Sequence, residues 1–177
     1  MKLKSVVMDK PAVQRSIARI THEIIEKNGG LDDLVLLGIR RRGLSLAAML
    51  QANMLKFENH SVPLGSIDIS LYRDDLTELT SLPSAGESDI PCDLTGRTVV
   101  LVDDVIFTGR TARAAIEAVF HHGRPKSIQL AVLIDRGHRE LPIRADFVGK
   151  NVPTARNEHV KVNMTEIDSF DSVELHG

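Results

Sequence analysis

The stretch from Val99 to Thr111 reads VVLVDDVIFTGRT and decides the fold. It begins with an apolar run typical of a buried strand, here 98–102, and this run leads to two adjacent carboxylates, Asp103 and Asp104. A short segment with threonine and glycine follows, and apolar residues at helical spacing then predict a helix over 110–122. A buried strand that passes directly into a helix indicates an α/β protein with a mainly parallel central sheet flanked by helices.

Strand-like and helix-like patterns alternate along the rest of the chain. Apolar residues recur at helical spacing from Val13 to Ile24, and Asp9 suits the first turn of that helix. The run Arg40–Gly43 is predicted as a turn, because it directly follows a short apolar strand. The predicted helices are 10–28, 44–56 and 110–122, the last with Ala112, Ile116, Val119 and Phe120 inward, and the predicted strands are 34–39, 67–71, 98–102, 128–134, 147–148, 160–164 and 173–175.

One long segment has no core pattern. From Arg73 to Cys92 the periodicity disappears, and acidic residues, serine, proline and glycine dominate. Loops of this length inside a compact domain are usually lids or disordered segments. The sequence therefore predicts either a lid or a disordered segment at about 72–91, with an ordinary flexible loop as the plainer alternative.

Composition and charge exclude several classes of protein. At 177 residues the chain fits one domain, so we expect a single domain over 1–177. A net charge of −2 excludes a uniformly basic protein, so any RNA contact needs a local basic patch. The single cysteine, Cys92, excludes an internal disulfide and fits a reducing compartment. Without a signal segment or a run of about 18 apolar residues, the sequence predicts a cytoplasmic protein with no membrane partner.

The residue types after the predicted strand suit a particular kind of ligand. A helix N-terminus offers unpaired N–H groups and a positive dipole end, so the start of the 110–122 helix favours an anion. Thr108 and Thr111 add hydroxyl donors, and Gly109 lets the backbone approach a phosphate closely. Asp103 and Asp104 repel phosphate, so their partners are sugar hydroxyls or a divalent cation. A ligand with both a phosphate and a ribose diol satisfies the whole segment.

A plainer interpretation is a buried strand that ends in a solvated, helix-capping pair of aspartates, and for a lone Asp-Asp it is the better one. The agreement of the full stretch favours the ligand site. The stretch is neither the phosphate loop Gly-x-x-x-x-Gly-Lys-[Ser/Thr] nor the dinucleotide fingerprint Gly-x-Gly-x-x-Gly.

The same stretch resembles the motif with which type I phosphoribosyltransferases bind phosphoribosyl pyrophosphate (PRPP). Other stretches are similar to one branch of that family, the pyrimidine-operon attenuation regulators with uracil phosphoribosyltransferase activity, and the similarity covers almost the whole chain. This resemblance implies the type I phosphoribosyltransferase fold, with a flexible lid loop and a small base-binding hood. The stretches that carry it, beside Val99–Thr111, are Gly38–Gly43, Gly65–Leu76, Ile128–Asp146 and Gly149–Thr154.

The resemblance also implies roles for individual residues. Asp103 and Asp104 become the catalytic carboxylates, which hold the ribose hydroxyls and contact Mg²⁺ indirectly, through substrate or water. Arg40 and Arg41 lie near the leaving pyrophosphate, although a solvated loop is the alternative for this arginine run. Residues for PRPP and nucleotide binding are, besides these two arginines, Val105, Ile106, Phe107, Thr108, Gly109, Arg110 and Thr111.

The implied reaction is uracil plus PRPP giving UMP plus pyrophosphate, dependent on Mg²⁺ and without an organic prosthetic group. In the lid, Tyr72 and Arg73 are expected to reach the site on closure and to exclude water. The base is expected near Asp135 and Arg136 and towards Val160.

Members of this branch bind the leader of pyrimidine-operon mRNA, and the uridine nucleotides UMP and UTP are the expected effectors. Arg15, Arg19 and His22 share one face of the first helix, opposite its core stripe. Each basic residue taken alone is a solvated charge, and only the resemblance favours RNA. Two departures stand out, since position 18 is alanine where many relatives carry threonine, and positions 40–42 read Arg-Arg-Arg where many read Lys-Thr-Arg. The residues expected to bind RNA are Arg19, His22, Arg139, Arg144 and Lys150.

Three functions remain open at this point. The first is an enzyme that also binds RNA as an attenuation regulator. The second is a phosphoribosyltransferase without RNA binding, on uracil or another base. The third is a regulator that senses nucleotides without catalysis. The resemblance further implies a homo-oligomer, either a dimer or a higher assembly.

Overall fold

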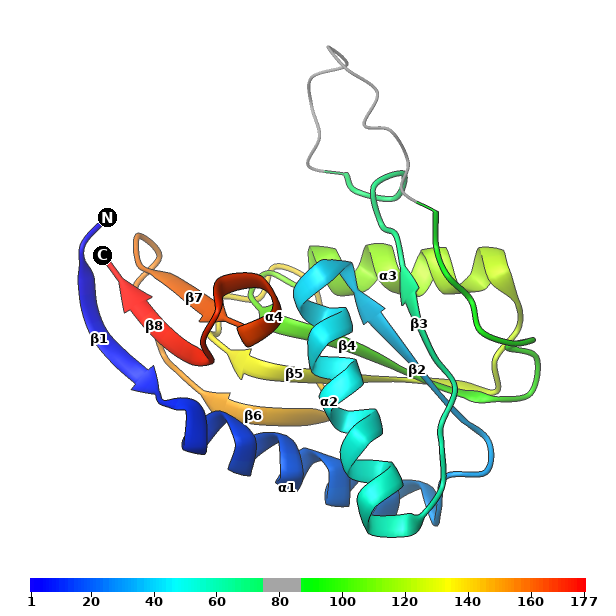
Figure 1. Cartoon of the computed structure of the whole chain (residues 1–177). Coiled ribbons are helices and arrows are strands. Elements are labelled where there is room, and N and C mark those ends of the chain that lie inside the picture. The colour runs from blue at the N-terminus through cyan, green and yellow to red at the C-terminus, as the bar shows by residue number, and fades with distance from the viewer. Residues whose placement is uncertain (75–86) are drawn as a thin grey trace.

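A five-stranded parallel sheet forms the centre of the fold (Figure 1), in a computed structural model that describes residues 1–74 and 87–177. The strand order is β3-β2-β4-β5-β6, and all four strand pairs are parallel. The predicted α/β class and parallel sheet are therefore confirmed. In chain order the elements are β1 (Leu3–Met8), α1 (Lys10–Asn28), β2 (Leu34–Ile39), α2 (Arg40–Glu58), β3 (Leu64–Ile67), β4 (Thr98–Ile106), α3 (Arg110–His122), β5 (Ser127–Asp135), β6 (Phe147–Asn151), β7 (His159–Asn163), α4 (Thr165–Asp168) and β8 (Ser172–His176).

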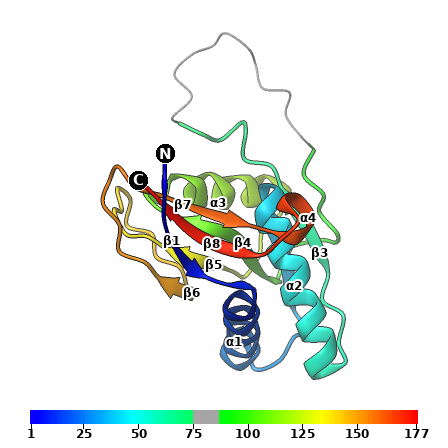
Figure 2. The same ribbon diagram turned by 60° about the vertical axis from the view of Figure 1, so that its left-hand side comes forward.

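Helices cover both faces of this sheet, which makes a three-layer arrangement (Figure 2). Successive side chains of a strand point to opposite faces. Val100 and Val102 of β4 accordingly belong to the cluster with α1 and α2, whereas Val99 and Leu101 belong to the cluster with α3. Each such buried side chain contributes roughly 1.5–3 kcal/mol relative to an exposed one. Burial on both faces explains why the central strands are continuous apolar runs.

A second, smaller sheet lies at one end of the molecule (Figure 1). It has three antiparallel strands in the order β1-β8-β7, and α4 connects β7 to β8. We call these three strands and α4 the hood. Its strand β1 was not among the predicted elements, whereas β7 and β8 lie where alternation predicted them.

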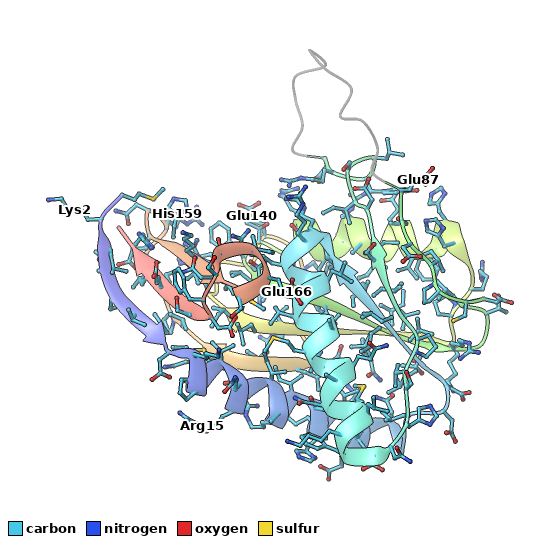
Figure 3. All side chains as sticks on the ribbon, in the orientation of Figure 1. Lys2, Arg15, Glu87, Glu140, His159 and Glu166 are labelled. Carbon is cyan, nitrogen blue, oxygen red and sulfur yellow. The ribbon has the colours of Figure 1, made fainter. Side chains whose placement is uncertain are left out.

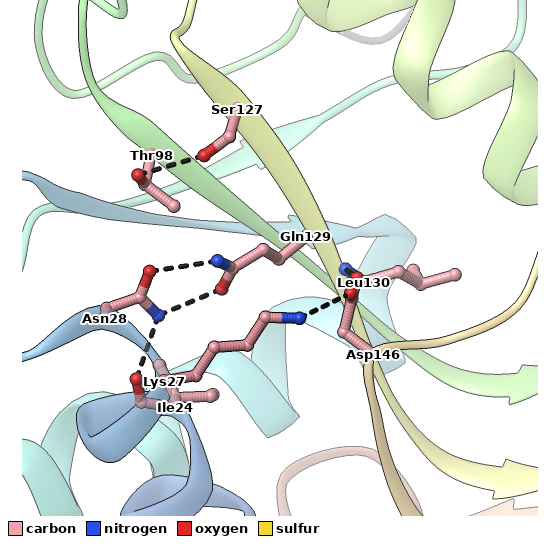
Figure 4. A network of polar contacts seen from close by, with 8 residues as sticks. All are labelled: Ile24, Lys27, Asn28, Thr98, Ser127, Gln129, Leu130 and Asp146. Carbon is pink, nitrogen blue, oxygen red and sulfur yellow. Dashed lines mark hydrogen bonds and ion pairs between the residues drawn. The ribbon is translucent and has the colours of Figure 1, made fainter.

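The helix α1 begins and ends as predicted. Asp9 caps its first turn, because its carboxylate accepts a hydrogen bond from the Ala12 N–H at 2.9 Å. At the other end, the side-chain amides of Asn28 and Gln129 exchange hydrogen bonds of 3.0 and 2.9 Å (Figure 4). Lys27 also forms an ion pair with Asp146, at 2.8 Å. These contacts fix the end of α1 to β5 and to the start of β6.

The prediction of a turn at Arg40–Gly43 is wrong, because α2 begins at Arg40, immediately after β2. The helix can begin there because Gly43 has no side chain. A Cβ atom at Gly43 would lie 2.3 Å from the Val102 carbonyl oxygen, and one at Gly38 would lie 2.3 Å from the Leu44 Cα atom. The first turn of α2 therefore packs directly against the backbone of β4.

Two further predictions need correction. The strand expected over 67–71 is the shorter and earlier β3, which ends at Ile67. The carboxylate of Asp68 accepts from the backbone N–H and the hydroxyl of Ser70, at 2.9 and 2.6 Å, and this local turn replaces the strand ladder. Leu71 is 67% exposed. Phe120, expected to face inward, is 53% exposed, because the smaller Ala115, Ala118 and Val119 form the buried stripe of α3.

Candidate functional site

A cavity lies at the carboxyl end of β4, where β4 passes into α3. It joins Asp103 of β4 to the N-terminus of α3, as the sequence predicted for the ligand. Of the residues predicted for nucleotide binding in Val105–Thr111, all line it. Glu140, Leu130 and Val132 were not predicted, since they come from β5 and the segment after it. The lining residues are Arg73, Asp103, Val105, Ile106, Phe107, Thr108, Gly109, Arg110, Thr111, Ala112, Leu130, Val132 and Glu140.

The N-terminus of α3 is suited to an anion. Gly109 precedes the helix with φ 95°, a left-handed conformation that favours glycine, and no side chain caps the first turn. The hydroxyl of Thr108 lies 3.4 Å from the Arg110 N–H and so makes at most a weak hydrogen bond. No acidic residue lies in that turn. The uncapped N–H groups and the helix dipole therefore favour negative charge in the cavity.

Asp103 is buried, with 9% of its surface exposed. Its carboxylate accepts a hydrogen bond from the Asp104 N–H at 2.9 Å. Burial raises the pKa of Asp103 well above its ordinary value, and the negative charge of Asp104 raises it further, while the positive charge of Arg40 opposes this shift. A hydroxyl donor or a cation in the cavity would stabilise the ionised carboxylate.

Asp104 differs from its neighbour. It is half-buried, its carboxylate accepts from the Val105 N–H at 2.9 Å, and it is not among the residues that line the cavity. Both aspartates lie inside β4, which continues to Ile106 and pairs Asp103 with Val132 of β5. The strand is longer than the predicted 98–102, because the ladder with β5 continues past the apolar run.

Arg40 and Arg41 lie in the first turn of α2, and both are exposed. They line a second hollow together with Ser66 and Asp68. Arg42, the third arginine of the run, points elsewhere, since its guanidinium donates to the Val162 carbonyl at 2.8 Å. Two of the three arginines are thus available for an anionic ligand.

The start of the predicted lid is held against α3. Arg73 lines the cavity, whereas the ring of Tyr72 lies 5.0 Å from that of His121, and its carbonyl accepts from Arg113 at 3.2 Å. Arg110 links Asp74 at 2.7 Å to Glu140 at 3.0 Å. Of the predicted lid, residues 75–86 lie outside the described residues.

The residues predicted to lie near the base are found in two different environments. Asp135 and Arg136 line a hollow beside the end of β5, whereas Val160 of β7 packs against the core. The guanidinium of Arg136 lies 4.0 Å from the ring centre of Phe107, which is a cation–π contact between this hollow and the main cavity. The remaining lining residues of the hollow are Gly137, His138, Asn151, Pro153 and Thr154.

Comparison with known proteins supplies the family. A family model described as "Phosphoribosyl transferase domain" matches residues 5–166. The chain belongs to the phosphoribosyl transferase family. A relative from Clostridium novyi is 57% identical over 175 residues, which cover 99% of this chain and 98% of that protein. A relative from Thermus aquaticus is also 57% identical over 175 residues, which cover 99% and 97%. Both are named "Bifunctional protein PyrR".

Solved structures of phosphoribosyl transferases share the fold. A hypoxanthine-guanine phosphoribosyltransferase from Bacillus anthracis aligns with a TM-score of 0.75 at 18% identity, and the alignment covers 99% of this chain and 100% of that one. A hypoxanthine phosphoribosyltransferase from Trypanosoma cruzi aligns with a TM-score of 0.75 at 24% identity, covering 98% and 96%. The predicted type I phosphoribosyltransferase fold is therefore confirmed.

This phosphoribosyl transferase carries a basic hollow on α1, distant in sequence from the cavity. Arg15, Arg19 and Lys150 line it, and Figure 3 shows Arg15 on the outer side of α1. Arg19 was expected on the face opposite the core, yet its guanidinium donates to the carbonyls of Val148 and Gly149 at 3.1 and 2.5 Å. Arg19 therefore lies at the junction of α1 with β6.

The other residues predicted to bind RNA lie apart from this hollow. The ring of His22 stacks on Phe57, with ring centres 4.5 Å apart. Arg144 is exposed and makes no hydrogen bond or ion pair with a described residue. Arg139 is half-buried, and its guanidinium donates to the Phe107 carbonyl at 2.7 Å, next to the main cavity. The sequence could not distinguish these environments, because it does not show which acceptors surround each basic side chain.

Among the described residues of this phosphoribosyl transferase, no group of three or more histidine, cysteine, aspartate or glutamate side chains could hold a metal ion. Asp103 and Asp104 alone do not make a resident metal site. They do fit the prediction that Mg²⁺ arrives with the substrate, because Mg²⁺ usually keeps waters and phosphate ligands. In the described part of the chain, no helix is long and apolar enough to cross a membrane.

Proposed function

We propose that the chain is a uracil phosphoribosyltransferase, which converts uracil and PRPP to UMP and pyrophosphate, and that it also binds the leader of pyrimidine-operon mRNA. The observation that carries the enzymatic part is the cavity that combines the buried Asp103 with the uncapped N-terminus of α3. Similarity over 99% of the chain to proteins named "Bifunctional protein PyrR" supports the two-part function.

The proposed position of the substrate follows from charge. The 5-phosphate of PRPP binds at the N-terminus of α3, where Thr108, Thr111 and the backbone of Gly109 donate to it. Asp103, with Asp104 beside it, accepts hydrogen bonds from the ribose hydroxyls. Cleavage of a glycosidic bond develops positive charge on the sugar, which ionised Asp103 stabilises.

The pyrophosphate leaves with several negative charges. Arg40 and Arg41 are exposed cations in the first turn of α2, where they line a second hollow, and they stabilise the charge that develops on the leaving group. Mg²⁺ enters as part of the PRPP substrate, contacts Asp103 and Asp104 indirectly, and neutralises phosphate charge. No organic prosthetic group is needed for this chemistry.

The uracil is placed in the hollow lined by Asp135 and Arg136. The side chain of Arg136 is occupied by the carbonyls of Ala155 and Glu158, at 3.2 and 2.7 Å, so base recognition rests on backbone groups and the remaining lining residues. The hypoxanthine-guanine and hypoxanthine phosphoribosyltransferases share only the fold at this level of identity, so they do not decide the base.

For RNA, the basic hollow with Arg19 and Lys150 is the proposed centre, and the exposed His22 and Arg144 are proposed as further contacts outside it. Aromatic residues are only 3% of the chain, so phosphate contacts and polar recognition of unpaired bases carry the binding. UMP or UTP is the proposed effector. An mRNA partner implies action in the cytoplasm. A homo-oligomer would place several such hollows on one particle, and light scattering tests the oligomeric state.

The first experiment is a nucleotide-synthesis assay with PRPP and Mg²⁺ on uracil, hypoxanthine, guanine and adenine in parallel. Turnover with uracil alone is expected. Turnover with a purine would keep the PRPP site and reject uracil as the base. Failure with all four bases, together with tight UMP binding, would favour a nucleotide-sensing regulator without catalysis.

The RNA part is tested separately with leader RNA, with and without UMP. Reversal of charge in Arg144→Glu is expected to weaken RNA binding, because Arg144 is exposed and unpaired among the described residues. Equal affinity of this variant and the parent would reject the proposed surface. A parent that does not bind leader RNA, yet turns over uracil, would favour the enzyme without RNA binding.

A further inference from the structure

The side chain of His22 lies flat against that of Phe57. Their ring centres are 4.5 Å apart and their planes differ by 4°, so one face of the imidazole lies over the phenyl ring. His22 belongs to α1 and Phe57 to the last turn of α2, and both helices pack on the same face of the central sheet. His22 is exposed, whereas Phe57 is half-buried. The stack therefore holds an exposed polar ring against a ring that the fold supports.

A polar contact joins the same two helices beside this stack. The side-chain amide of Asn53 donates to the Thr21 hydroxyl at 3.3 Å, and that hydroxyl donates to the Ile17 carbonyl at 2.8 Å. Asn53 and Phe57 are four residues apart, so they share one face of α2. Thr21 is fully buried and directly precedes His22 on α1. The position of Phe57 relative to the backbone of His22 is therefore set by contacts on the buried side of the pair.

The polar edge of the His22 ring is available to a ligand. Among residues 1–74 and 87–177, neither imidazole nitrogen has a hydrogen bond or an ion pair. A neutral imidazole presents one donor and one acceptor at its edge, and a protonated one presents two donors. Such groups suit the edge of an unpaired base or a phosphate oxygen. His22 also follows Arg19 by three residues, so the two are neighbours on the surface of α1.

We propose that Phe57 is a positioning residue of the RNA surface, which holds the imidazole of His22 in the orientation that contacts the RNA. This inference rests on the RNA part of the proposed function. A side chain that is mobile in the free protein must be ordered on binding, which lowers the affinity roughly 2- to 10-fold. Phe57 orders the imidazole before the RNA arrives, so this loss is avoided. The phenyl ring acts through His22 and does not itself stack on a base.

The test is a double-mutant cycle of Phe57→Leu and His22→Ala. Affinity for the leader RNA is measured at low salt, where weakened variants still bind measurably. Leucine keeps an apolar side chain but has no flat ring, so F57L is expected to weaken RNA binding roughly 2- to 10-fold. In the H22A background, F57L should have no further effect, because its effect passes through the imidazole. Phe57→Tyr keeps the flat ring and should bind like the parent.

Phe120→Leu is the matched control. Phe120 is 53% exposed on α3, which packs on the other face of the sheet, so F120L makes the same change away from the stack. F120L should keep the parental RNA affinity. Parental affinity of F57L, an equal loss in F57L and F120L, or an equal loss from F57L with and without His22 would each overturn the proposal. If F57L fails to fold, Phe57→Met takes its place, because methionine is apolar, suits a helix and has no ring.

Proton NMR gives a readout that needs no RNA. A phenyl ring stacked on an imidazole moves the imidazole C–H resonances upfield through its ring current. The His22 resonances are identified by their loss in H22A. In F57L they should move downfield, towards those of exposed histidines, and in F120L they should stay in place. Identical His22 resonances in F57L and the parent would show that the stack does not form, and would overturn the positioning role.

The two readouts separate this inference from the proposed function on which it rests. A parent protein that does not bind leader RNA would reject the RNA function, and the role of Phe57 would be rejected with it, whatever the NMR spectra show. A parent that binds RNA, with a stacked His22 but without coupling between the two substitutions, would reject the positioning role alone. RNA binding, an upfield His22 and full coupling together are the expected result.

Discussion

The guanidinium of Arg42 lies 3.2 Å from both carboxylate oxygens of Asp168. Arg42 belongs to the first turn of α2 and Asp168 to α4, so this pair joins the hood to the helix that begins with Arg40 and Arg41. A second hydrogen bond beside it, from Ser45 to Glu166 at 2.9 Å, joins the same two helices. The proposed pyrophosphate residues are thus fixed relative to the hood.

Arg42→Gln should lower the free energy of unfolding by about 1–2 kcal/mol, because it removes charged hydrogen bonds that are only partly shielded from water. Urea unfolding measures this change. The neighbouring Arg41→Gln is the control, and it should leave the free energy of unfolding unchanged while it lowers kcat/KM for PRPP. Equal stability of R42Q and the parent would show that the contact with Asp168 contributes nothing.

Asp103→Asn should lower the activity and raise the free energy of unfolding at neutral and alkaline pH. Burial and Asp104 raise the native pKa of Asp103 above its unfolded value, so between these two pKa values the native state binds more protons and its stability falls as the pH rises. Asparagine carries no charge, so D103N should be more stable than the parent at pH 8. This advantage should shrink as the pH falls toward about 4, the ordinary aspartate value.

Thermal unfolding from pH 4 to pH 8 measures that difference, and steady-state kinetics should show a fall in kcat/KM of roughly 100-fold. Asp32→Asn serves as the control, because the Asp32 side chain is 97% exposed and its 3.9 Å contact with His60 is a surface pair that should contribute little to stability. A stability difference between D103N and the parent that does not vary with pH would contradict the assigned burial of the charge.

Gly109→Ala should cost about 1–2 kcal/mol of stability, because φ is 95° there and side chains other than glycine are strained in that region. Gly96→Ala makes the same kind of change at φ 73°, in a turn where a Cβ atom meets nothing within 4 Å. Both variants should lose similar stability in urea, but only G109A should weaken UMP binding. Loss of UMP binding in G96A as well would mean that general destabilisation, and not the loop, causes the effect.

Arg136→Lys should be destabilising although it keeps the charge. Arg136 is 6% exposed and burial lowers its pKa, while its guanidinium donates to two backbone carbonyls and to the Thr154 hydroxyl at 3.1 Å. An ammonium cannot reach these acceptors together, and the unpaired groups cost about 2–3 kcal/mol. Thermal unfolding measures this loss of stability, with Arg156→Lys at an exposed position as the control. Equal unfolding midpoints of the two variants would show that the hydrogen bonds of Arg136 do not stabilise the fold.

The elements with a local signal could be predicted from the sequence. The helices α1 and α3 have the bounds that periodicity and capping residues indicated, because a helix satisfies its hydrogen bonds within one segment. The strand β1 could not be predicted. Leu3 and Val6 are exposed, and β1 exists as a strand because it pairs with β8 at the other end of the sequence.

The same distinction applies to the site. The cavity at the carboxyl end of β4 could be predicted because strand, carboxylates, glycine and helix start follow one another in one stretch. The contacts of Arg136 and Arg139 could not, since their acceptors include carbonyl groups from other loops, which every sequence contains. Similarly, the three arginines 40–42 look equivalent in the sequence, but only Arg42 is bound to the hood.

The close contact between Gly43 and the Val102 carbonyl has a consequence for how this enzyme can change. The backbone of α2 contacts the backbone of β4 at this point. The distance between the arginines at the start of α2 and the carboxylates after Val102 is therefore set by the backbone, and a change of side-chain rotamer cannot alter it. Variation in base preference is therefore expected elsewhere, in the hollow beside the end of β5 where the uracil is proposed to bind. Directed evolution of base preference should randomise residues 151–160 and keep Gly43 and Val102 unchanged.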